Sequence, residues 1–172
     1  MRFKISVDPG VTGTGYAVWW DDTKRQKTPV DTGILIPGSY YDGLPERLLQ
    51  LEKGLQRVVN SCGGMVTQFA VEWPSYFSSG KGNTSAARGD LGKLYGAATT
   101  AVLSGMRCCH NVELIDVVTW KGQLPKPIVV KRIMKILQCG DKAYKSHEWD
   151  AIGIGLYAFF GFWREENDNG KN

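Results

Sequence analysis

The chain has 172 residues, of which 42% are hydrophobic and 22% are charged, so it is long enough for one compact domain and too short for two large ones. No run approaches the roughly 18 consecutive apolar residues of a membrane-spanning helix, and we expect a soluble protein with no membrane partner. A formal net charge of +4 is compatible with a polyanionic partner but is not diagnostic of one.

The first part of the chain predicts a meander of three strands. Residues 3–8 are apolar until Asp8, and residues 16–20 and 30–36 form two further strand-like runs. Turn residues separate the first two runs, and the polar segment 21–27 separates the second from the third. The chain therefore opens with a meander rather than with a βαβ unit.

Two long helices with a strand between them are predicted next. Five apolar residues recur at spacings of four and three, which is typical of an amphipathic helix. They are Leu44, Leu48, Leu51, Leu55 and Val58. Residues 66–72 predict a strand that ends on Glu72, residues 75–82 a loop, and residues 84–106 a helix rich in Ala and Gly.

The remaining elements are one strand and two helices. Residues 112–118 predict the strand and residues 121–127 a loop, with Pro127 at the first position of a helix over residues 128–137. Ser146 is a candidate N-cap for a last helix.

That last helix is predicted over residues 147–163, within a single domain of residues 1–164 that precedes a polar tail, residues 165–172. The element order β-β-β-α-β-α-β-α-α predicts an α/β protein: a five-stranded mixed sheet flanked by helices.

The cysteines and the N-terminus indicate a reducing compartment. Cys62, Cys108, Cys109 and Cys139 contain no C-x-x-C pair, which argues against a zinc site. The first residues lead directly into a predicted strand, without the apolar leader of a signal peptide. We therefore expect reduced thiols and a cytoplasmic protein.

Three acids and one histidine stand where the predicted fold would bring them together. If the first and fourth strands are parallel neighbours, Asp8 and Glu72 lie side by side at one edge of the sheet. Asp150 falls in the first turn of the last helix, and His147, three residues before it, shares its helix face. We expect all four side chains to converge on one site.

This combination predicts metal chemistry. Carboxylates so close together disfavour one another's ionisation, and a divalent cation relieves that repulsion. Oxygen ligands with one imidazole suit Mg²⁺ or Mn²⁺. Two such ions about 4 Å apart activate a water and stabilise the leaving oxygen of a phosphodiester. We therefore predict a metal-dependent nuclease with two Mg²⁺ ions per active site, replaceable by Mn²⁺.

Each of these residues also has an ordinary structural explanation. Asp8 precedes a Pro-Gly pair and fits a turn, and Glu72 fits an edge charge. Asp150 fits the dipole at a helix N-terminus, and His147 fits a surface histidine. Their combination in this element order favours the catalytic interpretation.

Four segments resemble motifs of the RuvC-type Holliday-junction resolvases, in the ribonuclease-H-like superfamily. They are VDPGVTGTGYAV at residues 7–18, FAVE at 69–72, LGKLYGAA at 91–98 and HEWDAIGIG at 147–155. The segments occur in the same order and with similar spacing over nearly the whole chain. The resemblance implies a ribonuclease-H-like fold and a homodimer that cuts two strands of a four-way DNA junction symmetrically, leaving ligatable nicks.

The same resemblance implies roles for the acids. Asp8, Glu72 and Asp150 match the family's metal-binding acids, and His147 stands where family members carry either an acid or a histidine.

Basic residues cluster in the segment 120–145, which carries seven Lys and Arg against one acid. Lys126 resembles the family's catalytic-site lysine, which stabilises charge on the phosphate, and Lys121 resembles its phosphate-binding partner. Lys131 and Lys135 are candidates for positioning the DNA backbone, and Lys93 on the second helix is a further one. The alternative for Lys131 and Lys135 is a solvated surface lysine.

Tyr76 and Phe77 are candidates for the aromatic that family members insert near the junction centre. Stacking on an unpaired base contributes roughly 1–3 kcal/mol. The loop after Glu72 is spaced differently from the family's, and the basic loop 120–126 is shorter than in cellular members. This compact form resembles phage resolvases, for which the compartment is the bacterial host cytoplasm. Cutting-sequence preference and a branch-migration partner are therefore left open.

Three alternatives remain open. A nuclease of the same superfamily that acts on flaps, forks or RNA–DNA hybrids would carry the same acids. An actin-like ATPase or sugar kinase would use the turn after Asp8 for phosphate, but it needs two such domains. A DNA-binding protein that has lost catalysis would have no need of Glu72 in an otherwise apolar strand.

Overall fold

The computed structural model describes residues 1–22, 27–36, 43–63, 65–74, 85–122, 124–139 and 144–163, with residues 85–89 described by their backbone alone. Its strands are β1 (Phe3–Asp8), β2 (Thr14–Trp20), β3 (Asp31–Leu35), β4 (Val66–Trp73) and β5 (Val112–Asp116). Its helices are α1 (Leu44–Ser61), α2 (Ser85–Cys108), α3 (Val117–Lys121), α4 (Lys126–Leu137) and α5 (Ser146–Phe160). No helix in these ranges is long and apolar enough to cross a membrane.

The five strands form one mixed sheet in the order β3-β2-β1-β4-β5. β1, β2 and β3 pair antiparallel, whereas β4 pairs parallel with both β1 and β5. The predicted α/β class, with a three-stranded meander followed by alternating helices and strands, is confirmed. The second strand begins two residues earlier than predicted, because Gly15 already pairs with Asp8.

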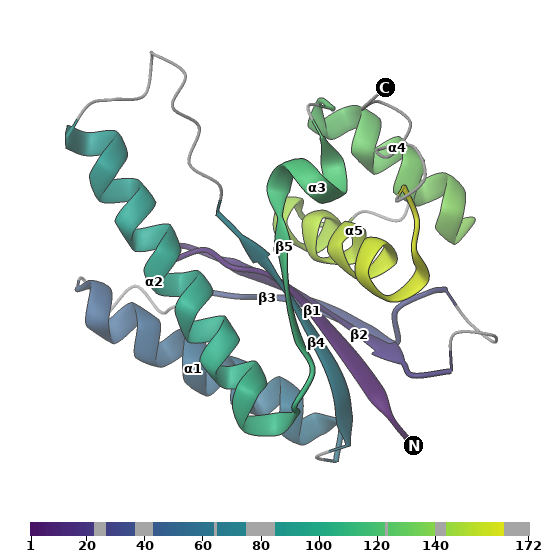
Figure 1. Ribbon diagram of the computed structural model, residues 1–172, viewed down its shortest axis with the longest axis horizontal. Helices are drawn as coiled ribbons and strands as arrows, with labels where there is room; N and C mark the ends of the chain where they lie inside the picture. The colour runs from purple at the N-terminus through teal and green to yellow at the C-terminus, as the bar shows by residue number, and fades with distance from the viewer. Residues whose placement is uncertain are drawn as a thin grey trace.

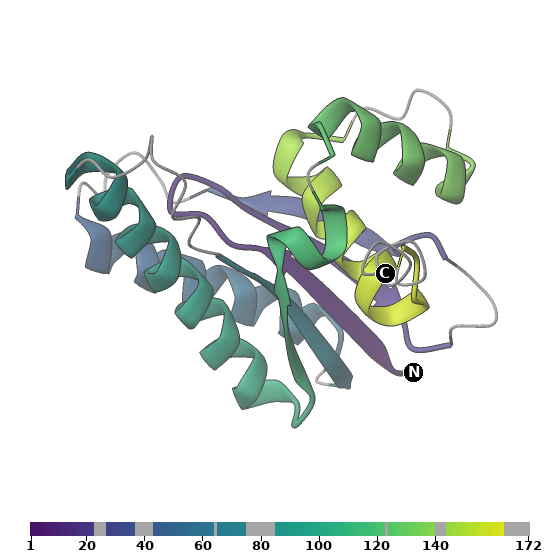
Figure 2. The same ribbon diagram turned by 45° about the horizontal axis from the view of Figure 1, so that its top comes forward.

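Helices cover the two faces of the sheet (Figures 1 and 2). α1 and α2 lie on one face, over an apolar core that includes Ile5, Leu55 and Phe69. α5 lies across the other face, with α4 packed outside it, over a second core that includes Trp19 and Ile133. The sheet therefore separates two cores.

A buried hydrogen-bond chain fixes α5 to the sheet. The Trp19 indole donates to Ser6 Oγ at 2.9 Å, and the Ser6 hydroxyl donates to the backbone carbonyl of Ala151 at 2.7 Å. A Cβ added at Gly155 would lie 2.5 Å from the Trp19 ring, so only glycine allows helix and sheet to approach this closely. The hydrogen bond to Ala151 therefore fixes the helix one residue after Asp150.

The prediction of a strand through residue 118 is wrong. β5 ends at Asp116, and Val117–Lys121 form the short helix α3 instead. The β-branched residues in this stretch favour a strand, but the turn of α3 buries the Trp120 ring, which is 1% exposed, beneath α5. Burial of an indole outweighs the local strand preference.

Three helix boundaries also differ from the predicted ones. α4 begins at Lys126, which places Pro127 at its second position rather than its first. Lys145, not Ser146, is the N-cap of α5, and its N–H donates to the Glu148 carboxylate at 2.9 Å. α5 ends at Phe160 rather than at residue 163, because Gly161 adopts a φ of 72° and closes the helix.

Candidate active site

The carboxyl ends of β1 and β4 bring two acids together. The strands are parallel, with Val7 opposite Val71, so Asp8 and Glu72 follow at the same level of the sheet. Asp8 is buried and Glu72 is half-buried. The predicted adjacency of these two residues is therefore what the topology produces.

α5 adds its first turn to this edge of the sheet. His147 Nδ1 lies 2.7 Å from Asp8 Oδ2, and the buried Asp150 lies beside them. One potential ligand atom from each of these three residues lies within 4.8 Å of the others. Two carboxylates and an imidazole at this spacing form a set that can hold a divalent cation.

Glycine and threonine in the turn after Asp8 make room for α5. A Cβ added at Gly15 would lie 2.0 Å from the backbone oxygen of His147, so any other residue there would push the helix away. The buried Thr14 hydroxyl donates to the Gly10 carbonyl at 2.8 Å and accepts from the Gly10 N–H at 3.0 Å. The glycine-rich motif thus serves to seat α5 against β2.

Glu72 is held differently from the other acids. Its Oε2 accepts a hydrogen bond of 2.7 Å from the Trp120 indole, and it is not among the three residues of the close ligand set in the described part of the chain. Burial, followed by the negative charge of Asp8, raises the pKa of Glu72 to about 7. The Glu72 carboxylate thus lies close enough to Asp8 for the charge of Asp8 to raise its pKa, while the Trp120 indole orients it.

The pKa of Asp8 is shifted in the same direction as that of Glu72. Burial raises the pKa of Asp8, an effect that the His147 hydrogen bond opposes and the Asp150 charge reinforces. The same hydrogen bond raises the pKa of His147. A bound cation would favour ionised Asp8 and Glu72, because it replaces the water that burial removed.

Two of the predicted lysines lie at this cluster. Lys126 Nζ donates to Asp150 Oδ2 and, at 2.5 Å, to Ser146 Oγ. Lys121 Nζ lies 5.0 Å from the centre of the Trp120 ring, and its charge lowers the pKa of both Asp8 and Glu72. Positive charge therefore faces the acids from α3 and from the start of α4.

Of the other predicted DNA-binding residues, the three that the structure describes, Lys93, Lys131 and Lys135, lie on the surface of helices α2 and α4. Lys93 on α2 pairs with Asp90 at 2.9 Å on the surface, and Lys131 is an exposed residue of α4. Tyr76 and Phe77 lie outside the described residues.

Sequence reasoning did not find Trp120 and Gly15. Trp120 falls between the predicted strand 112–118 and the predicted loop 121–127, and its role depends on a helix that buries it against Gly153. Gly15 stands in a motif that was recognised, but its contact with His147 joins segments more than 130 residues apart. In the sequence, the feature that could have indicated this close contact is the density of glycines after Asp8.

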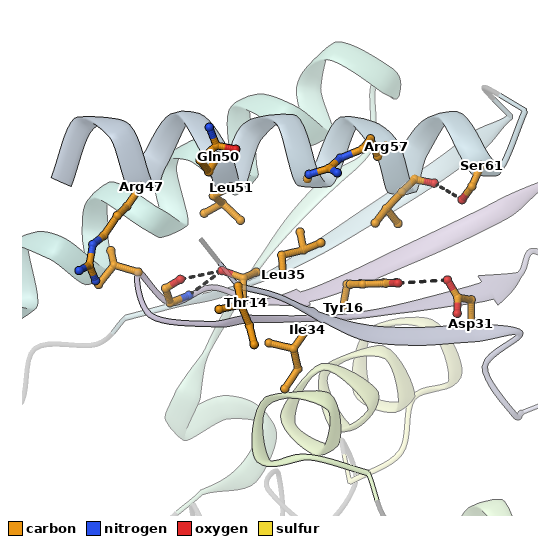
Figure 3. Close-up of a pocket in the computed structure, with 15 residues that line it drawn as sticks. Thr14, Tyr16, Asp31, Ile34, Leu35, Arg47, Gln50, Leu51, Arg57 and Ser61 are labelled. Carbon is orange, nitrogen blue, oxygen red and sulfur yellow. Dashed lines mark hydrogen bonds between the residues drawn. The ribbon is translucent and has the colours of Figure 1, made fainter. Parts of the chain in front are cut away.

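A separate pocket of about 450 Å³ lies on the α1 side of the sheet (Figure 3). α1 contributes Arg47 and Arg57 to it, and β2 and β3 contribute Tyr16 and Asp31. The Tyr16 hydroxyl donates to Asp31 Oδ2 at 3.2 Å, and burial with this charge raises the pKa of Tyr16 to about 12. The pocket reaches the turn after Asp8, but His147 and Asp150 come from the opposite face of the sheet.

Comparison with solved structures identifies the fold. The chain superposes on T. thermophilus RuvC in complex with a Holliday junction substrate with a TM-score of 0.67 and 18% identity, over 94% of this chain and 95% of that chain. It superposes on the Thermus thermophilus RuvC structure with a TM-score of 0.66 and 20% identity, over 93% and 95%. No protein-family model and no curated protein matches the sequence. The chain has the ribonuclease-H-like fold of RuvC.

Proposed function

We propose that this chain is a metal-dependent endonuclease that resolves four-way DNA junctions by paired symmetric nicks. The observation that carries the proposal is the convergence of Asp8, His147 and Asp150 within 4.8 Å, beside Glu72. The similar fold of RuvC, solved with a Holliday junction substrate, supports the choice of substrate. On this proposal the whole of residues 1–164 is one nuclease domain, followed by a polar tail of residues 165–172.

Asp8, His147 and Asp150 would hold a divalent cation, and Glu72 would help to hold a second one. The Trp120 indole donates a hydrogen bond to one Glu72 oxygen, and this bond fixes the orientation of the whole carboxylate. Three carboxylates favour Mg²⁺, and the imidazole makes Mn²⁺ a workable substitute. When bound, such ions activate a water and stabilise the leaving oxygen.

The protein's own groups prepare the phosphodiester for hydrolysis. In this reaction the oxygen of water bonds to phosphorus and loses a proton, one P–O ester bond breaks, and the departing oxygen takes up a proton to leave as a hydroxyl. Lys126, which contacts Asp150, would hold a non-bridging oxygen of the scissile phosphate. Lys121 adds positive charge from the α3 side. Asp8 fixes the His147 ring through its Nδ1.

The oligomeric state, the DNA contacts and the compartment in this proposal follow from the resemblance to RuvC-type resolvases. Symmetric nicking requires a homodimer with one site in each subunit. Lys93 and Lys131 would contact the DNA backbone, and Tyr76 or Phe77 would stack near the junction centre. A compact phage-like resolvase would act in the cytoplasm of a bacterial host.

Cleavage of a substrate panel tests the proposal. In Mg²⁺, an immobile four-way junction should be nicked at paired symmetric positions, in preference to a flap, a fork or an RNA–DNA hybrid. Preference for one of those three would instead identify the alternative nuclease with the same acids.

Asp8→Asn tests the assignment of the site. Because the variant loses a metal ligand while a negative charge facing DNA is removed, cleavage should fall at least about 100-fold with junction binding retained. Asp31→Asn, the same change on β3 at a residue that bonds Tyr16, is the matched control and should cleave normally. Normal cleavage by Asp8→Asn would show that the acids are not the active site.

A further inference from the structure

The end of α5 opposite the acids borders a basic and aromatic pocket of about 590 Å³. Three cationic and three aromatic side chains line it: Lys27, Arg132, Lys135, Phe160, Phe162 and Trp163. No acidic residue of the described segments lines it. The cations come from α4 and from the chain just before β3, and the aromatic residues from the end of α5 and the turn after it.

The aromatic side of the pocket is organised around the end of the helix. Gly161 ends α5, and Phe162 and Trp163 follow, with ring centres 6.4 Å apart. Trp163 has a φ of 64°, a backbone conformation that bulky residues rarely adopt. Such strain is retained where surrounding contacts hold the residue, and here Trp163 lies against the ring of Trp120 at 6.5 Å.

The cationic side brings three basic residues from two segments to one pocket. Lys27 Nζ lies 4.8 Å from the centre of the Phe162 ring, a cation–π contact. Arg132 and Lys135 are three residues apart on one helix, so they repel each other as well as Lys27. The negative end of the α5 dipole offsets part of that repulsion, but it is far smaller than three charges. An anionic ligand with flat apolar faces would satisfy both sides of the pocket.

We propose that this pocket binds the phosphate backbone of a DNA strand, at a distance from the acids. The inference rests on the proposed function, because it assigns a second contact to the same substrate. Phosphates would lie against Lys27, Arg132 and Lys135, and a base or sugar face would lie against Phe162.

Helix geometry sets the position of this contact on the DNA. α4 runs from Lys126, which contacts Asp150, to the segment that carries Lys135. From Asp150 to Phe160, α5 rises over ten residue steps, or about 15 Å at the rise of an α-helix. A strand that ran along α5, at about 3.4 Å per nucleotide, would meet the pocket roughly four or five nucleotides from a phosphate held at the acids.

The paired variant Arg132→Gln/Lys135→Gln tests the contact. Affinity for the junction is measured in EDTA by fluorescence anisotropy at several salt concentrations. The slope of log affinity against log salt should become shallower by about 1.8, or roughly 0.9 for each phosphate that the variant no longer neutralises. Arg2→Gln/Lys53→Gln changes the net charge equally at exposed positions elsewhere and should leave the slope unchanged. Equal slopes in the two paired variants would overturn the proposal.

Neutral methylphosphonate links test the distance. Placed four or five nucleotides from the cut, they should weaken binding of the unmodified protein and not that of Arg132→Gln/Lys135→Gln. If both proteins lose affinity equally, the pocket does not contact those phosphates and the proposal fails.

Phe162→Leu identifies the form of the strand, because leucine keeps apolar volume and removes the aromatic face. A loss of roughly fivefold or more on single-stranded DNA alone indicates a stacked base, and no loss on either DNA indicates contact with the backbone of a duplex arm. If DNA affinity is unchanged in every pocket variant and an acidic peptide binds instead, the pocket has a protein partner.

The failure of this proposal is distinguishable from the failure of the proposed function. Substitutions in the pocket leave cleavage at saturating DNA intact, because none of these residues touches the acids. A chain that binds DNA through the pocket and cleaves nothing would disprove only the nuclease assignment.

Discussion

The two ends of α5 carry opposite charge. At the N-terminal end, Asp8 and Asp150 lie together and burial raises the pKa of Asp8. At the C-terminal end, Lys27 and Lys135 share a pocket with no acid from the described segments. Lys126 and Lys121 offset part of the charge of the acids, and a bound cation would offset more of it, whereas a phosphate would offset the charge of the basic end.

The two ends of α5 should affect different measured quantities, the cleavage rate at one end and the affinity for DNA at the other. If the acidic end holds the metal and the basic end holds the DNA, substitutions at the first should lower the cleavage rate at saturating DNA. Substitutions at the second should weaken binding and leave that rate unchanged. A substitution in the basic pocket that lowered the rate at saturating DNA would contradict this division.

The largest effect is expected from Lys126→Gln, at the acidic end. Its ammonium group contacts Asp150, and removing one donor to a developing negative charge lowers a rate by about 100-fold or more. Single-turnover cleavage at saturating junction measures it. Lys131→Gln, at an exposed position of the same helix, is the control and should alter affinity alone. An equal fall in rate for both would show that α4 acts only through general charge.

A smaller effect is expected from Trp120→Phe, which removes the indole donor to Glu72 and keeps an aromatic ring. Loss of a group that orients a metal ligand typically weakens metal affinity by about 10-fold. The Mg²⁺ concentration that gives half-maximal cleavage should rise accordingly. Trp20→Phe, at a half-buried ring stacked on Phe3, is the control. An unchanged Mg²⁺ dependence would mean that the indole only fills space.

Gly15→Ala tests whether the seat of α5 is needed. The added methyl group would displace the His147 backbone, which we expect to destabilise the fold by about 1–3 kcal/mol and to misalign the acids. Chemical denaturation and cleavage measure the two effects. Gly92→Ala is the control, because a Cβ there meets nothing within 4 Å and alanine favours a helix. If both variants unfold and cleave alike, the close contact at Gly15 is unimportant.

The smallest effect is a dependence of stability on pH. Burial raises the pKa of Glu72 from 4.5 to about 7, so between these values the folded protein holds a proton that the unfolded chain has released. Its contribution to stability is complete below pH 4.5 and is lost as the pH rises through 7. His147, whose pKa is also raised, acts in the same direction.

The melting temperature in EDTA should therefore fall by several degrees between pH 5 and 8, at about 2–4 °C for each kcal/mol in a chain of this size. Mg²⁺ should restore it at pH 8, and Glu72→Gln should flatten the dependence. If Mg²⁺ did not change the melting temperature at pH 8, a metal site at the acidic end would be contradicted.

The acidic end could largely be predicted from the sequence. Asp8 and Glu72 end apolar strands, and the spacing of His147 and Asp150 fits one helix face, so local patterns with one assumption about strand order bring them together. Trp120 could not be predicted, because its strand-like neighbours are overruled by burial of its ring. Local preference decides an element only where tertiary packing is neutral.

The basic end was only partly predictable. Lys135 belongs to a basic stretch that is visible in the sequence, but Lys27 precedes it by more than one hundred residues. Their meeting depends on where α5 ends, and Gly161 stops the helix three residues before the predicted boundary. That early stop is what turns Phe162 and Trp163 toward the cations.

The hydroxyl of Ser6 has a consequence for when the site forms. It accepts from one buried partner and donates to another, so α5 cannot rotate by one residue, about 100°, without stranding polar atoms in the core. His147 and Asp150 are thereby aligned by the fold itself. On the proposed function, little of the free energy of DNA binding would be needed to assemble the acids, and it would serve to orient the strand.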